Sequence, residues 1–246
     1  MAVDGAPPTK IKAGERIGHS RTFLEPVELK RGQRRDRSCE IFEDFHADAG
    51  ATLPTPWGTV DVSSAGTPTI DYVADSANGS FVLTHDTQDE LQSMTLSFAD
   101  QLVVDIAQGP VFEAKVTLTT ALTADQRVVV GLASARNATL DSIATNAWFR
   151  MEGANLDILW ETDDGTTNDD DNNTGSDWVS GTAMVLRIDC RNLAQIVFYI
   201  DGVAVAAGAM AAATGNLQPY IEIQKDAGAD ANSLNIDYVS VVWDRV

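Results

Sequence analysis

The last fifth of the chain consists of short apolar segments separated by turn residues, a pattern typical of β-strands. Residues 198–206 have an apolar arm on each side of Asp201-Gly202, a dipeptide that accepts the positive φ angles of a tight turn. We therefore expect the two arms to pair as an antiparallel hairpin. Residues 219–224 and 234–243 follow as two further predicted strands.

The alternation of apolar and polar residues predicts which side chains of these strands face a core. In residues 219–224, Ile221 and Ile223 point one way, and Glu222 and Gln224 point the other way. The last strand is expected to alternate in the same manner, with an apolar face made by Ile236, Tyr238 and either Val241 or Trp243.

Upstream of this region, short apolar runs recur between clusters of Gly, Pro, Asn and Asp, with almost no helical periodicity. This spacing is typical of a β-sandwich or barrel, so we expect an all-β chain built as an antiparallel jelly-roll sandwich. Further strands are predicted at residues 69–73, 80–84, 94–98, 102–106, 111–118, 127–133, 147–151, 156–161 and 184–189.

Two motifs in the predicted strands point to a known fold family. Residues 199–202 read Tyr-x-Asp-Gly and residues 237–241 read Asp-Tyr-Val-x-Val. At these residues the chain resembles the concanavalin A-like lectin/glucanase sandwiches. More narrowly, it is similar to the tailed-bacteriophage virion proteins that use this fold. The resemblance implies one concanavalin-like β-sandwich over residues 41–246.

Charge divides the chain into two unlike parts. Residues 1–40 hold nine Lys and Arg against six acidic residues, a net charge of +3, while the remainder holds 8 basic and 30 acidic residues, a net charge of −22. A polyanionic body is repelled by phosphates and by anionic lipid surfaces. We therefore expect neither nucleic acid nor a membrane as the partner of the body.

Residues 1–40 are predicted to form an extended basic arm, because Pro and Gly interrupt them too often for a long helix. Apolar residues lie between the charged clusters, which suits a segment that docks on another protein's surface. A solvated tail and a nucleic-acid-binding arm are the alternatives. The candidate partner-binding residues are Arg16, Arg21, Phe23, Leu24, Val27, Leu29, Lys30, Arg31, Arg34, Arg35 and Arg37.

The sequence lacks the carboxylate pattern of the glucanases that share the resembled fold. Those enzymes carry Glu-x-Asp-x-Glu on one strand, or the same motif with one extra residue. The nearest segment here has Asn155 in place of the first Glu and places Glu161 one position late after Asp157. A carboxyl pair from different strands, such as Asp157 with Glu152 or Glu222, stays as an alternative. No catalytic residue is assigned.

Histidines and cysteines show no catalytic or metal-binding spacing. His19, His46 and His85 are scattered, without the spacing of zinc ligands. Cys39 and Cys190 lie far apart, and we expect both to be free thiols. No cofactor and no metal site is predicted from these residues.

Residues 161–177 form a strongly acidic stretch that is predicted to be a solvated, mobile loop. Carboxylates are ligands that Ca²⁺ prefers, so a calcium site at Asp169, Asp170 and Asp171 is the alternative. The stretch cannot be aligned with the calcium-binding loop of an EF-hand.

Exposed aromatic residues beside polar side chains favour carbohydrate binding, because sugar rings stack on them. Trp148 and Trp160 lie in strand-like runs and are expected in the core, whereas Trp57 and Trp178 are expected to be exposed.

These observations favour a non-enzymatic virion protein, a head decoration or cement protein of a tailed bacteriophage. The arm would bind the major capsid protein, and the body would self-associate as a trimer on the outer capsid surface. The start of the chain lacks a basic segment followed by an apolar one, so we expect no export signal and assembly in the host cytoplasm. A carbohydrate-binding tail or adhesin module is the alternative, and a β-glucanase-type glycoside hydrolase ranks third.

Overall fold

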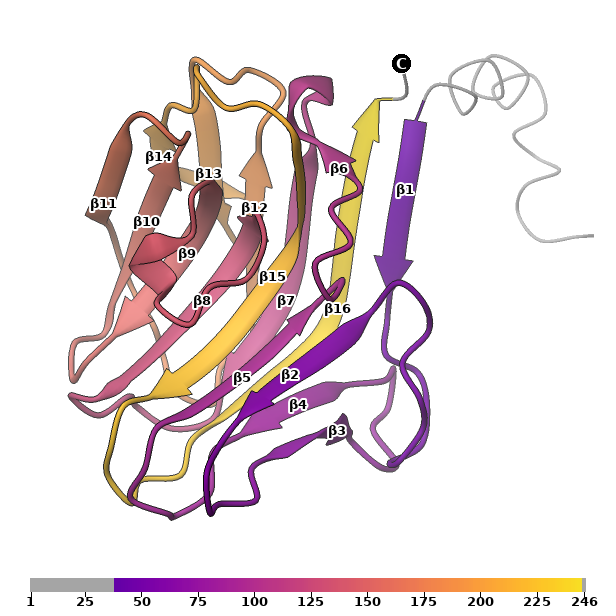
Figure 1. Cartoon of the computed structure of the whole chain (residues 1–246), viewed down its shortest axis with the longest axis vertical. Helices are drawn as coiled ribbons and strands as arrows, with labels where there is room; N and C mark the ends of the chain where they lie inside the picture. The colour runs from indigo at the N-terminus through magenta and orange to yellow at the C-terminus, as the bar shows by residue number, and fades with distance from the viewer. Residues whose placement is uncertain (1–37, 245–246) are drawn as a thin grey trace, which may run out of the picture. The chain divides into compact units, whose positions relative to one another are not determined.

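The computed structural model describes residues 38–244 of the 246-residue chain. The predicted partner-binding residues of the arm, from Arg16 to Arg37, lie outside the described residues. The described part forms two eight-stranded antiparallel sheets, here called sheet A and sheet B, which pack face to face (Figure 1). The prediction of an all-β antiparallel sandwich is confirmed.

Each sheet combines strands from distant parts of the sequence. Sheet A has the order β14 (Val203–Gly208), β13 (Ile196–Ile200), β12 (Met184–Asp189), β7 (Val111–Leu118), β16 (Ser233–Asp244), β4 (Phe81–Thr84) and β3 (Thr69–Tyr72), with β1 (Ser38–Glu43) paired to β16. Sheet B has the order β11 (Asn168–Asp177), β10 (Asp157–Asp163), β9 (Asn146–Glu152), β8 (Gln126–Ala133), β15 (Asn216–Lys225), β5 (Gln92–Ser97) and β2 (Gly58–Val62), with β6 (Val104–Asp105) paired to β15.

The core lies between the two sheets and follows the alternation of the strands. Met94 and Leu96 of β5 and Phe149 of β9 point inward from sheet B, and Phe112 and Phe198 point inward from sheet A; all five are fully buried. The rings of Phe149 and Phe198 meet edge to face at 5.2 Å between centroids, so the two sheets are in direct contact. Ile221 and Ile223 also belong to this core, as predicted.

The predicted hairpin at Asp201-Gly202 is confirmed. Asp201 has φ 49° and Gly202 has φ 79°, the left-handed conformations that a two-residue turn requires. The turn joins β13 to β14. The Asp201 carboxylate accepts a hydrogen bond from the Val185 backbone N–H at 2.9 Å, which ties the turn to β12.

The face predicted for Tyr238 is wrong, because β16 contains a bulge. Ile236 lies opposite Val116 of β7 while Tyr238 lies opposite the next residue, Lys115, so Asp237 is the extra residue. The bulge turns Tyr238 to the outer face of sheet A, where its hydroxyl donates to Glu113 Oε1 at 2.7 Å. A bulge of this kind shifts the alternation by one residue, which a strict period of two cannot reveal.

The structure of the acidic stretch, residues 161–177, also differs from the prediction. Residues 168–177 form β11, which pairs with β10 as the edge strand of sheet B, so the predicted mobile loop is a β-hairpin.

Two further strands, β1 and β2, were not predicted from the sequence. β1 begins at Ser38, so the first strand includes the last residues of the segment assigned to the arm.

Two of the tryptophan predictions fail. Trp57 is 7% exposed and Trp178 is 2% exposed, so neither offers a stacking platform. Trp57 packs on Phe45 and Phe98 between the sheets. Trp148 is buried as expected, but it points to the outer face of sheet B, where a loop covers it.

The thiols of Cys39 and Cys190 are free, as predicted. Burial raises the pKa of the Cys190 thiol far above its ordinary value, so this group stays protonated. Within residues 38–244, no helix is long and apolar enough to cross a membrane.

Candidate functional site

Part of the outer face of sheet B, which points away from sheet A, is covered by residues 134–145. This segment connects β8 to β9 and lies in front of sheet B in Figure 1. It includes the 3-10 turn η3 (Leu140–Ser142). Leu140 and Ile143 are buried against Trp148 and Tyr220 of the sheet in a second, smaller hydrophobic cluster. The apolar contacts hold the segment on the sheet.

Beneath this segment lies a buried carboxylate, Glu222 of β15, which is 1% exposed. Ser93 and Thr95 donate hydrogen bonds to its two oxygens at 2.8 and 2.9 Å, and the Tyr220 hydroxyl donates a third. The Arg136 guanidinium of the covering segment lies 3.9 Å from the carboxylate. Burial, then the charge of Glu222, raise the pKa of Tyr220, so the phenol keeps its proton and donates. Glu222 is therefore fully engaged by the protein itself.

A second buried carboxylate, Glu161 of β10, is 2% exposed. The Trp148 indole N–H donates to one of its oxygens, and Arg150 Nη1 donates to the other at 3.1 Å. Burial raises the pKa of Glu161 to about 7, and Asp171 of β11 adds to the increase as a carboxylate neighbour that hydrogen-bonds to the protonated form. Arg150 also binds Asp141 of the covering segment, at 2.7 Å.

The two buried carboxylates cannot act as a glycosidase pair. Glu161 is on β10 and Glu222 is on β15, and β9 and β8 lie between these strands. Three strand spacings of about 4.8 Å separate them by about 14 Å, whereas paired glycosidase carboxyls lie roughly 5–10 Å apart. On β15 itself the outward positions beside Glu222 are Tyr220 and Gln224. No second carboxylate therefore accompanies Glu222 on its strand.

Asp157, the carboxylate considered from the sequence, lies near the start of β10. Its side chain accepts a hydrogen bond from Asn155 at 2.6 Å. Glu152, at the end of β9, forms an ion pair with Arg150 at 2.6 Å. Glu222 lies three strands away from Asp157. Each proposed partner of Asp157 is thus either paired with a cation or distant.

The residues suggested for metal binding are not brought together. Within residues 38–244, no group of three or more His, Cys, Asp or Glu side chains could hold a metal ion. Asp169 and Asp170 of β11 instead accept hydrogen bonds from Asn172 and Asn168, at 2.8 and 2.7 Å. His85 is buried, and burial followed by the Lys225 charge lowers its pKa to about 4, so it is neutral at pH 7. His19 lies outside the described residues.

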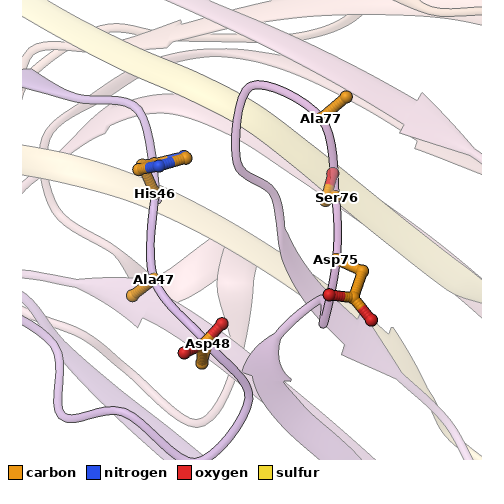
Figure 2. Close-up of a pocket in the computed structure, with 6 residues that line it drawn as sticks. All are labelled: His46, Ala47, Asp48, Asp75, Ser76 and Ala77. Atoms are coloured by element: carbon orange, nitrogen blue, oxygen red, sulfur yellow. The ribbon is translucent and has the colours of Figure 1, made fainter.

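An open pocket of about 410 Å³ lies between two loops. The loop from β1 to β2 contributes His46, Ala47 and Asp48, and the loop from β3 to β4 contributes Asp75, Ser76 and Ala77. Figure 2 shows the two loops on either side of the hollow, with the His46 ring directed toward the second loop. We call this site the loop pocket. Its volume falls within the ~300–1,000 Å³ of small-molecule sites.

Buried contacts fix the first loop of the pocket. Phe45, next to His46, is fully buried, and its ring lies 5.8 Å from Trp57 and 5.5 Å from Phe81 between centroids. Farther along the loop, the Gly50 backbone N–H donates to both oxygens of Asp71 on β3, at 2.8 and 3.0 Å. The loop is therefore tied to the core at one point and to sheet A at another.

A glycine sets the distance between the two loops. A Cβ atom on Gly79 would lie 2.2 Å from the Asp44 carbonyl oxygen and 2.8 Å from the His46 backbone N. Only glycine permits this approach, and its φ of 81° is also one that glycine accepts readily. Asp75 and Asn78 in the same loop have φ of 55° and 76°. The second loop is thus bent against the first, which brings Asp75 and Ser76 opposite His46 and Asp48.

The lining of the loop pocket suits a ligand rich in hydroxyl groups. The Asp48 and Asp75 carboxylates are hydrogen-bond acceptors, while the Ser76 hydroxyl and the His46 imidazole can donate and accept. Among residues 38–244, no lysine or arginine lines the pocket. In a chain of net charge −19, this arrangement disfavours anionic ligands. Sequence reasoning missed the site because its residues come from two loops. The Asn78-Gly79 turn was the one local signal.

Comparison with known proteins identifies the fold. No protein-family model matches the chain, and no curated protein matches its sequence. Among solved structures, a protein of unknown function from Shewanella oneidensis MR-1 matches with a TM-score of 0.61 and 12% identity, over 85% of this chain and 87% of that one.

Two other solved structures match whole sugar-related domains. The carbohydrate recognition domain of Emp47p has a TM-score of 0.56 and 11% identity, over 86% of this chain and 98% of that one. A glycoside hydrolase family 16 endo-glucanase from Bacteroides ovatus has a TM-score of 0.60 and 9% identity, over 82% of this chain and 99% of that one. The chain thus has the concanavalin A-like lectin/glucanase sandwich fold. At these identities the matches concern the fold alone.

Proposed function

We propose that this protein is a non-catalytic carbohydrate-binding module that holds a neutral sugar in the loop pocket. The observation that carries the proposal is the set of four polar side chains around about 410 Å³ of open space. Carboxylates and an imidazole bind sugar hydroxyls by direct hydrogen bonds, each worth about 1.5–3 kcal/mol when one partner is charged. The fold, which a carbohydrate recognition domain shares, supports this class of ligand.

We propose a non-catalytic role because the buried carboxylates of sheet B already bind other groups of the protein. The raised pKa of Glu161 is a property that a catalytic acid needs. However, Glu161 is 2% exposed and both of its oxygens already accept hydrogen bonds. Residues 134–145 pack on the same face of sheet B and limit the access of a substrate to both carboxylates. We therefore propose that Glu161 and Glu222 maintain the structure of this face.

A binding experiment tests the proposal. The full-length chain is screened on an array of neutral, amino and acidic glycans, and the best ligand is titrated by calorimetry. Asp48→Asn and Asp75→Asn keep the side-chain shape and remove the charge, and each should weaken binding about 10-fold or more. The matched control is Asp177→Asn, which removes an exposed charge from β11 in the other sheet. Binding that both pocket variants retain unchanged would refute the loop pocket as the site.

The virion interpretation stays a prediction. Its partner-binding residues, from Arg16 to Arg37, lie outside the described residues, and none of the solved structures named above is described as a virion protein. A carbohydrate-binding module is compatible with a tail or adhesin protein, the alternative raised by the sequence. A capsid-binding assay that compares the full chain with one lacking residues 1–40 tests the decoration role separately.

A further inference from the structure

We propose that β14 is a self-association site, through which two copies of the chain pair antiparallel and join their A sheets into one continuous sheet. β14 is an end strand of sheet A: it pairs with β13 on one side, and with no other strand of the described residues. A bulge at Val205 interrupts its pairing with β13, and on either side of the bulge its remaining backbone N–H and C=O groups are a template for a further strand. The proposal does not depend on the loop pocket.

β14 differs from the other edge strands in its charge. Its sequence, Val-Ala-Val-Ala-Ala-Gly, lies in a stretch without any charged residue between Asp201 and Glu222. The other edge strands in the described part each carry at least one acidic residue, namely Glu40 and Glu43 in β1, Asp61 in β2, Asp71 in β3, Asp105 in β6 and four Asp in β11. Charged residues on an edge prevent pairing with another chain, and β14 lacks this protection.

The distribution of charge also favours a second copy of this chain as the partner that pairs with β14. The chain has a net charge of −19, so two copies repel each other wherever acidic surfaces meet. Antiparallel pairing about a twofold axis sets β14 against itself, which brings no like charges into register. The nearest charged residue along the chain, Asp201, already accepts a hydrogen bond from the Val185 N–H. A twofold contact closes on itself and leaves no free β14 edge for further growth.

The side chains of β14 suit close pairing. Ala204 and Ala207 are small and exposed, and Val203 is 65% exposed, so pairing buries apolar surface without steric conflict. Six residues of strand bury less than the ~1,200 Å² of a standard interface, so we expect a weak dimer that depends on concentration. β11 lies next to β14 in the facing sheet, and its aspartates repel those of the second copy. Salt should therefore strengthen the dimer.

The interface leaves the loop pocket free. β14 and β3 are at opposite ends of sheet A, and the pocket is formed by the loops before β2 and after β3. A dimer would thus present two open pockets, which raises the avidity for a ligand with repeated sugars.

Sedimentation velocity of the full chain tests the proposal, at concentrations from about 5 to 500 µM and at about 0.05 and 0.5 M salt. The average mass should rise from 26.4 kDa toward twice that value, and more steeply at high salt. Ala204→Glu on β14 should keep the chain monomeric, because it places like charges in the interface. Thr69→Glu, at an exposed position of the opposite edge strand β3, is the matched control and should leave the dimer intact.

A second measurement locates the contact. Amide hydrogen exchange should slow in residues 203–208 between the lowest and the highest concentration, and circular dichroism should show that both variants are folded. A wild-type chain that stays monomeric under all conditions would overturn the proposal. A dimer that Ala204→Glu leaves intact, or one whose slowed amides lie elsewhere, would overturn it as well.

Discussion

Replacing Glu161 by glutamine should remove a pH-dependent loss of stability. The pKa of Glu161 is about 7 in the folded chain, compared with 4.5 for an ordinary glutamate. Below pH 4.5 the carboxyl is protonated in both states and the folded protein keeps its full stability. As the pH rises toward 7, the unfolded chain releases this proton more readily, so the folded state loses stability. Above pH 7 the loss is complete.

The size of the effect follows from the two pKa values. One pKa unit corresponds to ~1.4 kcal/mol, so the difference between 7 and 4.5 corresponds to about 3 kcal/mol. Glutamine resembles the protonated side chain in shape and in lacking a charge: its oxygen can accept from Trp148 or from Arg150, and its amide group can donate to Asp171. We therefore expect the stability of Glu161→Gln relative to the wild type to rise by about 3 kcal/mol between pH 4.5 and pH 8.

Urea denaturation at several pH values between 4.5 and 8, followed by tryptophan fluorescence, measures this difference. The other acidic residues near the cluster are present in both chains, so their contributions to the difference largely cancel. Asp177→Asn serves as the control, since it removes an exposed charge from the adjacent strand. Parallel stability curves for the wild type and Glu161→Gln would show that burial does not hold the proton on Glu161, and the reasoning would be refuted.

Two further substitutions test how the loops and strands are held. Lys225 is fully buried and donates to the carbonyl oxygens of Asp86, Gln88 and Gly228 at 2.6, 2.7 and 3.1 Å, so Lys225→Met should cost about 3 kcal/mol by leaving these acceptors unpaired. A loss below about 1 kcal/mol in thermal unfolding would contradict this role. At Gly131, a Cβ atom would lie 2.3 Å from the Ala147 carbonyl oxygen, so Gly131→Ala should force β8 and β9 apart and lower the unfolding midpoint by roughly 5 °C or more. An unchanged midpoint would show that the strands adjust freely.

The sequence predicted the parts of the fold where apolar residues alternate and turn residues are distinctive. The hairpin at Asp201-Gly202 is an example, because the turn conformation depends on those two residues alone. β11 escaped prediction because it is an edge strand made mostly of Asp and Asn, and its strand conformation comes from pairing with β10. Tyr238 was assigned to the wrong face because the bulge at Asp237 depends on the partner strand.

The candidate site was harder to predict from the sequence than the fold. The loop pocket requires the close approach of Gly79 to Asp44, two residues that are 35 positions apart. Nothing in either loop alone predicts that contact. The burial of Trp57 and Trp178 was missed for a similar reason, since both side chains belong to a core cluster whose members are far apart in the sequence.

The most direct test of the account is to incubate the full-length chain with a panel of neutral oligosaccharides and to measure binding and product release in the same samples. The account predicts saturable binding without any cleavage, and weaker binding for Asp48→Asn and Asp75→Asn than for Asp177→Asn. Release of shortened products that Glu161→Gln or Glu222→Gln abolishes would contradict it, because the buried carboxylates of sheet B would then be catalytic.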